Sequence, residues 1–276
     1  MPLRRLAATF ALLLALVVNG LANRLPLGGR TTGELSDLYA NLFVPAGVTF
    51  SIWGIIYLLL IAWAGVQFLA SATGLGRRLA LLFALSSVLN ATWLLVWHYQ
   101  RPVVSVFVMA ALLATLVGLN DRLHRFESRH ATGQSSRQAG RASGFLTLAR
   151  AAFGTYLGWI LVATVVNVTA ALVALGWDGD VGGLALSEAL WATVLVVVGA
   201  GIAIATLIRF RNPWIGMAVV WALGGIALGR WEAHPAIAWT AIYMMVAVGS
   251  AAITQWRTRG PGSGSGQVSA EAGGSA

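Results

Sequence analysis

The sequence contains no cysteine and no lysine among its 276 residues, so all 18 of its basic residues are arginines. The absence of cysteine excludes disulfides, thiol catalysis and cysteine metal sites, and the absence of lysine excludes Schiff-base chemistry. Of the four histidines, only His124 and His130 lie close together in the sequence, and their surroundings are rich in Ser and Gly. We therefore expect no metal site and no required cofactor.

Charged residues are also scarce, at 10% of the chain, whereas hydrophobic residues make up 58% and the mean hydropathy is +0.78. No soluble domain of this size could bury so much apolar surface, so the composition predicts an integral membrane protein. The formal net charge is +9, but the arginines lie between apolar runs rather than on one basic face. They therefore indicate membrane topology, and we predict no nucleic-acid partner.

The apolar runs are long enough for transmembrane helices, which need about 20 residues to cross the bilayer core. They predict an all-α, polytopic membrane bundle of about eight helices. The predicted spans are residues 5–23, 47–71, 79–99, 102–121, 150–176, 184–208, 213–229 and 235–256. The first run follows Arg4 and Arg5 and ends in small residues, so residues 1–23 fit either a retained helix or a cleaved signal peptide.

The distribution of arginine predicts the orientation, because short cytoplasmic loops carry the excess of positive charge. With eight spans and the N-terminus inside, fourteen arginines lie on the inner side and four on the outer side. We therefore expect both the N-terminus and the C-terminus to be cytoplasmic.

Three segments outside the spans differ in character. Residues 24–46 form an outer loop in which Thr31-x-x-Glu34 predicts a capping box, followed at helical spacing by Leu35, Leu38, Leu42 and Phe43. This loop is either an interfacial helix or a lid over a cavity. Residues 122–149 are basic and rich in Ser and Gly, which predicts a flexible cytoplasmic linker. The tail, 257–276, has the composition of a disordered segment.

Aromatic and amide side chains form stripes at helical spacing on three of the predicted spans. The members are Trp53 and Tyr57 on the second span, Asn90, Trp93 and Trp97 on the third, and Tyr156, Trp159, Ala163 and Asn167 on the fifth. An asparagine in a membrane helix contributes only about 0.6–2 kcal/mol to packing, so each amide alone is consistent with ordinary helix association.

The tryptophans favour a pocket over simple packing. Trp53, Trp93 and Trp159 lie several residues inside their spans, whereas interfacial tryptophans lie at the headgroup level. Bulky indoles also hinder the close helix approach that small residues permit. A cluster of them suits a cavity for a large, flat, apolar ligand whose orientation is fixed by a few polar atoms.

The motif Tyr156-Leu157-x-Trp159-x-x-x-Ala163-Thr164-x-x-Asn167 resembles the fifth-helix signature of the tryptophan-rich sensory protein (TspO) and translocator protein family. Asn90-x-x-Trp93 with Trp97 and Arg101 is similar to the third-helix motif of that family, and Pro45 with Trp53-x-x-x-Tyr57 is similar to its second-helix motif. The resemblance covers residues 1–176. Residues 177–256 add three further spans, as in the longer bacterial branch of the family.

This resemblance implies a five-helix bundle whose first loop covers a pocket, in a bacterial cytoplasmic membrane. The family's ligands include porphyrins and haem, so a small hydrophobic ligand of that kind, membrane lipids and a second copy of the chain are the implied partners. By resemblance, Trp53, Trp93, Trp159 and Ala163 contact the ligand. Tyr57, Asn90, Trp97, Tyr156 and Asn167 support the pocket. Pro45 stands alone where the family usually has paired prolines.

Other functions have weaker support in the sequence. Span interiors hold almost no ionisable residue, which argues against ion-coupled transport but leaves a passive transporter or flippase for a lipid-like metabolite open. Serines within the spans lack the Gly-x-Ser context of an intramembrane protease. Some bacterial relatives are linked to light-dependent porphyrin degradation, and His98 is conceivable as a haem ligand. We expect non-enzymatic binding, with His98 in a structural role.

Overall fold

A computed structural model describes residues 3–24, 29–39, 41–69, 74–130, 136–177, 180–181, 184–185 and 187–258. Within these ranges, eight helices are long and apolar enough to cross a membrane, which confirms the predicted all-α membrane bundle. They are α1 (Leu3–Arg24), α3 (Ile52–Leu69), α4 (Leu75–His98), α5 (Pro102–His130), α6 (Ser136–Ala174), α7 (Glu188–Arg209), α8 (Pro213–Arg230) and α9 (Pro235–Arg257). Large apolar side chains such as Phe10, Leu58 and Phe107 are exposed on the outer faces, where lipid would surround them.

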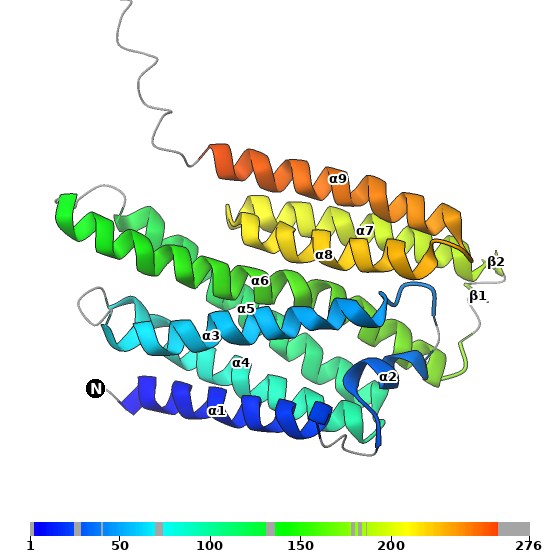
Figure 1. The fold of residues 1–276 in the computed structure, drawn as a ribbon, viewed down its shortest axis with the longest axis horizontal. Coiled ribbons are helices and arrows are strands. Elements are labelled where there is room, and N and C mark those ends of the chain that lie inside the picture. The colour runs from blue at the N-terminus through cyan, green and yellow to red at the C-terminus, as the bar shows by residue number, and fades with distance from the viewer. Residues whose placement is uncertain are drawn as a thin grey trace, which may run out of the picture.

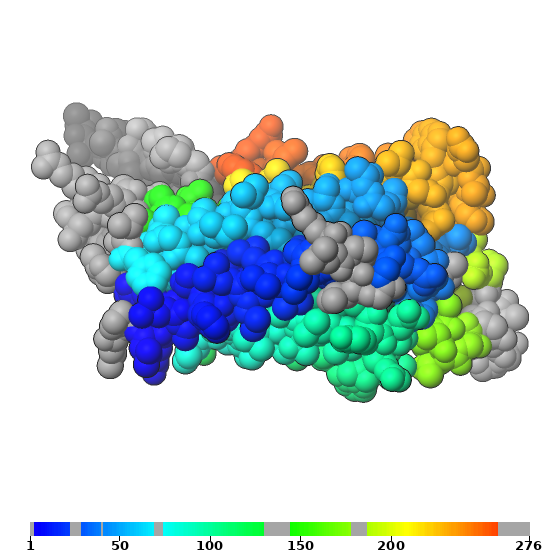
Figure 2. Space-filling view, turned by 60° about the horizontal axis from the view of Figure 1, so that its bottom comes forward, coloured from blue at the N-terminus to red at the C-terminus, as the bar shows by residue number. Residues whose placement is uncertain are grey.

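The helices form a layered bundle (Figure 1). Helix α1 packs against α4 and α3, α4 packs against α5, and α5 and α3 both pack against α6. Helix α8 lies on the other side of α6, and α9 packs against both α7 and α8. Figure 2 shows α1, in dark blue, covering one face of this assembly. Helix α6 therefore packs against helices of both groups, the first five membrane helices and the last three.

Short elements lie at one end of the bundle, opposite the first residues of α1 and the last residues of α9 (Figure 1). They are α2 (Thr32–Asp37), the 3-10 helix η2 (Gly47–Ser51), and the antiparallel pair of β1 (Asp180–Val181) and β2 (Leu184–Ala185), in which Asp180 pairs with Ala185. Prolines begin α5, α8 and α9, where a missing N–H costs nothing.

The capping box predicted in the outer loop is present. The Glu34 N–H donates to Thr31 Oγ1 at 3.3 Å, and the Thr31 N–H donates to Glu34 Oε2 at 2.7 Å. Hydrogen bonds from the Thr31 backbone, and then from its side chain, lower the pKa of the Glu34 carboxyl below its ordinary value. Helix α2 ends at Asp37, so Leu42 and Phe43 lie beyond it rather than continuing its face.

The segment 122–149, predicted as a flexible linker, is instead largely helical. Helix α5 continues to His130 and α6 begins at Ser136, while residues 131–135 lie outside the described ranges. An Asp121–Arg125 ion pair of 2.7 Å, one turn apart, supports the extension of α5. At the C-terminus, the predicted disordered tail lies outside the described residues from 259 onward.

Two glycines bring α8 against α6. A Cβ added at Gly158 would lie 2.3 Å from the carbonyl oxygen of Ile215, and one added at Gly154 would lie 2.4 Å from Nδ2 of Asn212. Gly154-x-x-x-Gly158 is the small-residue spacing that allows membrane helices to approach at backbone distance. The last three helices are thus packed tightly against the signature helix of the first five.

A buried polar network joins the same helices directly beside this glycine contact, one turn earlier in α6. Arg150 of α6 donates two hydrogen bonds, of 2.8 and 3.0 Å, to the carboxylate of Glu127 in α5, and a third to the carbonyl of Arg211 before α8. Asn212 donates to Asn120 Oδ1 at 3.3 Å and to the Arg150 carbonyl at 3.1 Å. Each bond spans two helices, so the network fixes α8 relative to α5 and α6.

Candidate tryptophan cavity

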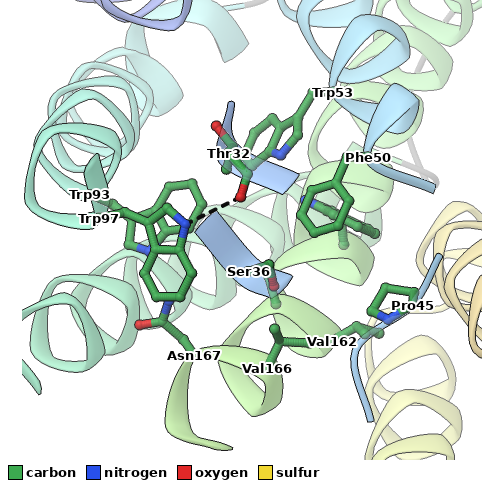
Figure 3. A pocket seen from close by; sticks show the side chains of 12 residues that line it. Thr32, Ser36, Pro45, Phe50, Trp53, Trp93, Trp97, Val162, Val166 and Asn167 are labelled. Carbon is green, nitrogen blue, oxygen red and sulfur yellow. Dashed lines mark hydrogen bonds between the residues drawn. The ribbon is translucent and has the colours of Figure 1, made fainter. Parts of the chain in front are cut away.

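The three aromatic stripes converge on one cavity at the end of the bundle that carries α2 (Figure 3). Trp53 comes from α3, Trp93 and Trp97 from α4, and Trp159 and Ala163 from α6. The remaining lining residues are Thr32, Ser36, Pro45, Phe50, Val162, Val166 and Asn167. We call this space the tryptophan cavity.

Trp53 stands at the centre of the aromatic cluster. Its ring centroid lies 5.3 Å from that of Tyr57 and 6.3 Å from that of Trp93, in stacked arrangements, and 6.3 Å from that of Trp159 at an interplanar angle of 82°. Stacked and edge-to-face pairs of this kind are favourable beyond the area they bury. The cluster thus provides flat aromatic faces from three helices in one place.

Buried polar atoms without partners lie around the same cavity. Trp93 and Trp159 are 4% and 2% exposed, and neither indole N–H has a hydrogen-bond partner among the residues that the structure describes. The hydroxyl of Ser36, which is 2% exposed, also has none within those residues. By contrast, the indole N–H of Trp97 donates to the Thr32 carbonyl at 3.4 Å (Figure 3). Unpartnered buried donors are costly, so a ligand with an acceptor atom would relieve that cost.

The two asparagines of the stripes hold helices together. Tyr57 of α3 donates its hydroxyl to Asn90 Oδ1 of α4 at 2.8 Å. Ser105 of α5 donates to Asn167 Oδ1 of α6 at 2.7 Å. Asn167 also lines the cavity, whereas Asn90 and Tyr57 lie behind Trp53 and are not among its described lining residues.

Several residues of the cavity are missing from the sequence-based prediction. Tyr156 was predicted, and it is 1% exposed with its ring 5.8 Å from that of Trp53. Ser36 and Phe50 line the cavity and were not predicted. Phe50 packs edge-on against Trp159 at 5.7 Å, and it reaches the cavity because η2 follows the outer loop. Only the path of that loop brings these residues to the tryptophans, and no motif marks it.

The tryptophan cavity holds little free space. Its volume is about 20 Å³, which is space for roughly one water molecule. A porphyrin-sized ligand needs a pocket of about 300 Å³ or more, so it enters only if part of the wall moves. The helices α3, α4 and α6 are fixed by their packing, and α2 and residues 41–50 cover the remaining side. We call residues 41–50 the roof segment.

His98, the candidate haem ligand, lies elsewhere. Its Nδ1 is 2.8 Å from the carbonyl of Leu94, one turn earlier in α4, and the ring is 4% exposed. It is not among the described residues that line the tryptophan cavity. The observed contact of the His98 ring is therefore with the backbone of its own helix, which is a structural role.

Comparison with models of protein families tests the family resemblance that the motifs indicate. A family model described as TSPO-like protein matches residues 5–254. The chain belongs to the TSPO-like family. Comparison with curated proteins and with solved structures gave no match. The matched range includes α7, α8 and α9, so the family model covers the last three membrane helices of this TSPO-like protein as well as the first five.

Proposed function

We propose that this TSPO-like protein binds a flat apolar ligand, by preference a porphyrin or related tetrapyrrole, in the tryptophan cavity. The observation that carries the proposal is the pair of indole N–H donors on Trp93 and Trp159, which have no partner among the described residues and lie among stacked and edge-to-face aromatic rings. Stacked indoles favour a planar π system, and the donors favour a ligand with acceptor oxygens such as carboxylates. An unbranched acyl chain would use neither feature.

Binding in this account has two stages. The roof segment first moves away, since a cavity of about 20 Å³ admits no such ligand. The ligand then enters between Trp53, Trp93 and Trp159, and its acceptor atoms take the free N–H groups. Asn90 and Asn167 keep α3, α4, α5 and α6 in register through their hydrogen bonds to Tyr57 and Ser105. Sensing or transfer would follow from this binding step, with no covalent chemistry.

Removing the free donors tests the proposal. We expect Trp93→Phe and Trp159→Phe each to weaken protoporphyrin binding about tenfold, because phenylalanine keeps a flat ring but lacks the N–H. The measurement is quenching of tryptophan fluorescence during titration of the purified protein with protoporphyrin. Trp239→Phe is the matched control, since Trp239 is 49% exposed on α9 and outside the cavity. No binding by the wild type, or equal affinity in all four proteins, would overturn the proposal.

A second candidate function, passive transfer of a lipid-like metabolite, has one observation in its favour. A mostly apolar groove of about 460 Å³ lies between α6 and α7, lined by Val165, Val168, Leu172 and Leu195 among others. It is far larger than the tryptophan cavity and lies among helices that span the membrane. Counterflow of a porphyrin or lipid across protein-containing liposomes would favour transfer over binding alone.

We also infer that the end of the bundle opposite α2 faces the cytoplasm of a bacterium. Fourteen of the 18 arginines belong to that side when eight spans alternate from a cytoplasmic N-terminus. A green fluorescent protein fused after residue 276 should therefore fluoresce, whereas an alkaline phosphatase fused there should be inactive. The reverse pattern would place the tryptophan cavity on the cytoplasmic side.

A further inference from the structure

We propose that α8 holds the tryptophan cavity closed through the roof segment, and that Arg230 is the positioning residue that sets how often the cavity opens. The inference deepens the proposed function, because a cavity of about 20 Å³ must widen before such a ligand binds. It concerns the roof itself, however, and can be tested without a ligand.

Arg230, the last residue of α8, binds three backbone carbonyls of the roof segment. Its Nε donates to the Leu42 carbonyl at 3.0 Å, and one terminal nitrogen donates to the carbonyls of Asn41 at 3.0 Å and Val44 at 3.2 Å. The planar guanidinium suits this arrangement, because its donors are fixed in a fork. One side chain thus satisfies three carbonyls in a stretch without helix or strand.

The rest of the roof segment is also held by α8. The Ala46 N–H donates to the Gly225 carbonyl at 3.0 Å, and the Trp221 indole N–H donates to the Thr49 carbonyl at 2.8 Å. A Cβ at Gly225 would lie only 1.9 Å from Thr49 Oγ1, so η2 rests directly on the backbone of α8. The two residues in each of these contacts lie at least 172 positions apart in the chain.

The roof segment connects these contacts to the cavity. Pro45 lies between the residues that Arg230 and Gly225 hold, and Phe50 follows Thr49; both line the tryptophan cavity. Moving Pro45 and Phe50 outward would break the hydrogen bonds to α8. Because hydrogen bonds from a charged group are the stronger ones, Arg230 should contribute most to keeping the roof in place.

The absence of native cysteine gives a direct test. Ser36→Cys introduces a single thiol in the cavity wall, at a position that is 2% exposed and whose side chain makes no hydrogen bond within the described part of the chain. We expect a maleimide to label this cysteine slowly in the otherwise wild-type protein, and about tenfold faster when Arg230→Met is added. Arg230→Lys should give an intermediate rate, because lysine keeps the charge but lacks the fork.

Two controls separate opening of the roof from general loosening. Arg209→Met removes an exposed arginine at the other end of the helices and should leave labelling of Ser36→Cys unchanged. Ser128→Cys, exposed in α5, should be labelled at one rate with or without Arg230→Met. A second variant, Trp221→Phe, removes only the bond to Thr49 and should speed labelling of Ser36→Cys several-fold.

An equal rate of maleimide labelling of Ser36→Cys with and without Arg230→Met would overturn the inference. The inference would also be overturned if Arg230→Met increased the labelling rates of Ser36→Cys and Ser128→Cys by the same factor. If Arg230→Met does not fold, an unchanged rate with Trp221→Phe would overturn it instead. Failure of protoporphyrin to bind would refute the proposed ligand and leave the labelling result standing, so the two proposals fail separately.

Discussion

Replacing Gly158 by leucine is expected to separate α8 from α6 and to destabilise the protein by about 3 kcal/mol. A Cβ at this position would lie 2.3 Å from the Ile215 carbonyl oxygen and 2.9 Å from the Ala218 Cβ. The obstructing atoms are backbone and a methyl group, neither of which can turn aside. The helices must therefore move apart, which also disturbs the contacts of Asn212 with α5 and α6. Thermal unfolding in detergent, followed by circular dichroism, measures the loss.

Gly201→Leu is the matched control for this substitution. Gly201 lies inside α7, also a membrane-length helix, and a Cβ there would meet nothing within 4 Å. It carries the same change in helix propensity and side-chain size without the obstruction. Equal unfolding temperatures for Gly158→Leu and Gly201→Leu would contradict the view that α8 is packed on α6 at backbone distance.

The eight membrane helices could be predicted from the sequence because each apolar run has the length of a bilayer crossing. The prediction of a flexible linker at residues 122–149 was wrong because it rested on composition alone. Ser and Gly between arginines indicate a linker, yet α5 and α6 both extend into this segment. Local hydrogen bonding continues a helix that is already formed, and ion pairs such as Asp121–Arg125 support it. Neither effect appears in a hydropathy pattern.

The candidate site could be predicted in part. The positions of Trp53, Trp93 and Trp159 on their helices follow from helical spacing, and the structure brings all three to one cavity. Ser36 and Phe50 could not be assigned to it, because a loop's path depends on tertiary contacts rather than on periodicity. In the sequence, Arg230 is only one of the four arginines predicted on the outer side, because its three carbonyl partners lie 186 to 189 residues earlier.

One signal for the α6–α8 contact was present in the sequence. Gly158 lies within the signature motif and Gly154 lies two residues before it, at the spacing typical of closely packed membrane helices. This part of α6 therefore has two faces. One carries Trp159 and Ala163 toward the cavity, and the other carries the two glycines toward α8. The same short segment thus joins the cavity wall to the helix that holds the roof.

Ala163 offers the strongest test of the cavity as a binding site. It is the small residue in a wall otherwise formed by Trp159, Val162 and Val166 of the same helix. With only about 20 Å³ free, a phenylalanine ring at this position would occupy the space that opening of the roof is expected to provide. Binding of a rigid planar ligand should then weaken about a hundredfold, the equivalent of about 3 kcal/mol of steric cost.

The decisive measurement is the dissociation constant of protoporphyrin by titration calorimetry of the protein in lipid nanodiscs, for wild type, Ala163→Phe and Val168→Phe. Val168 lies on the opposite side of α6, in the groove beside α7, and is 39% exposed. We predict that Val168→Phe binds as the wild type does, whereas Ala163→Phe binds about a hundredfold more weakly. Equal affinity of Ala163→Phe and wild type, or weaker binding by Val168→Phe alone, would contradict binding in the tryptophan cavity.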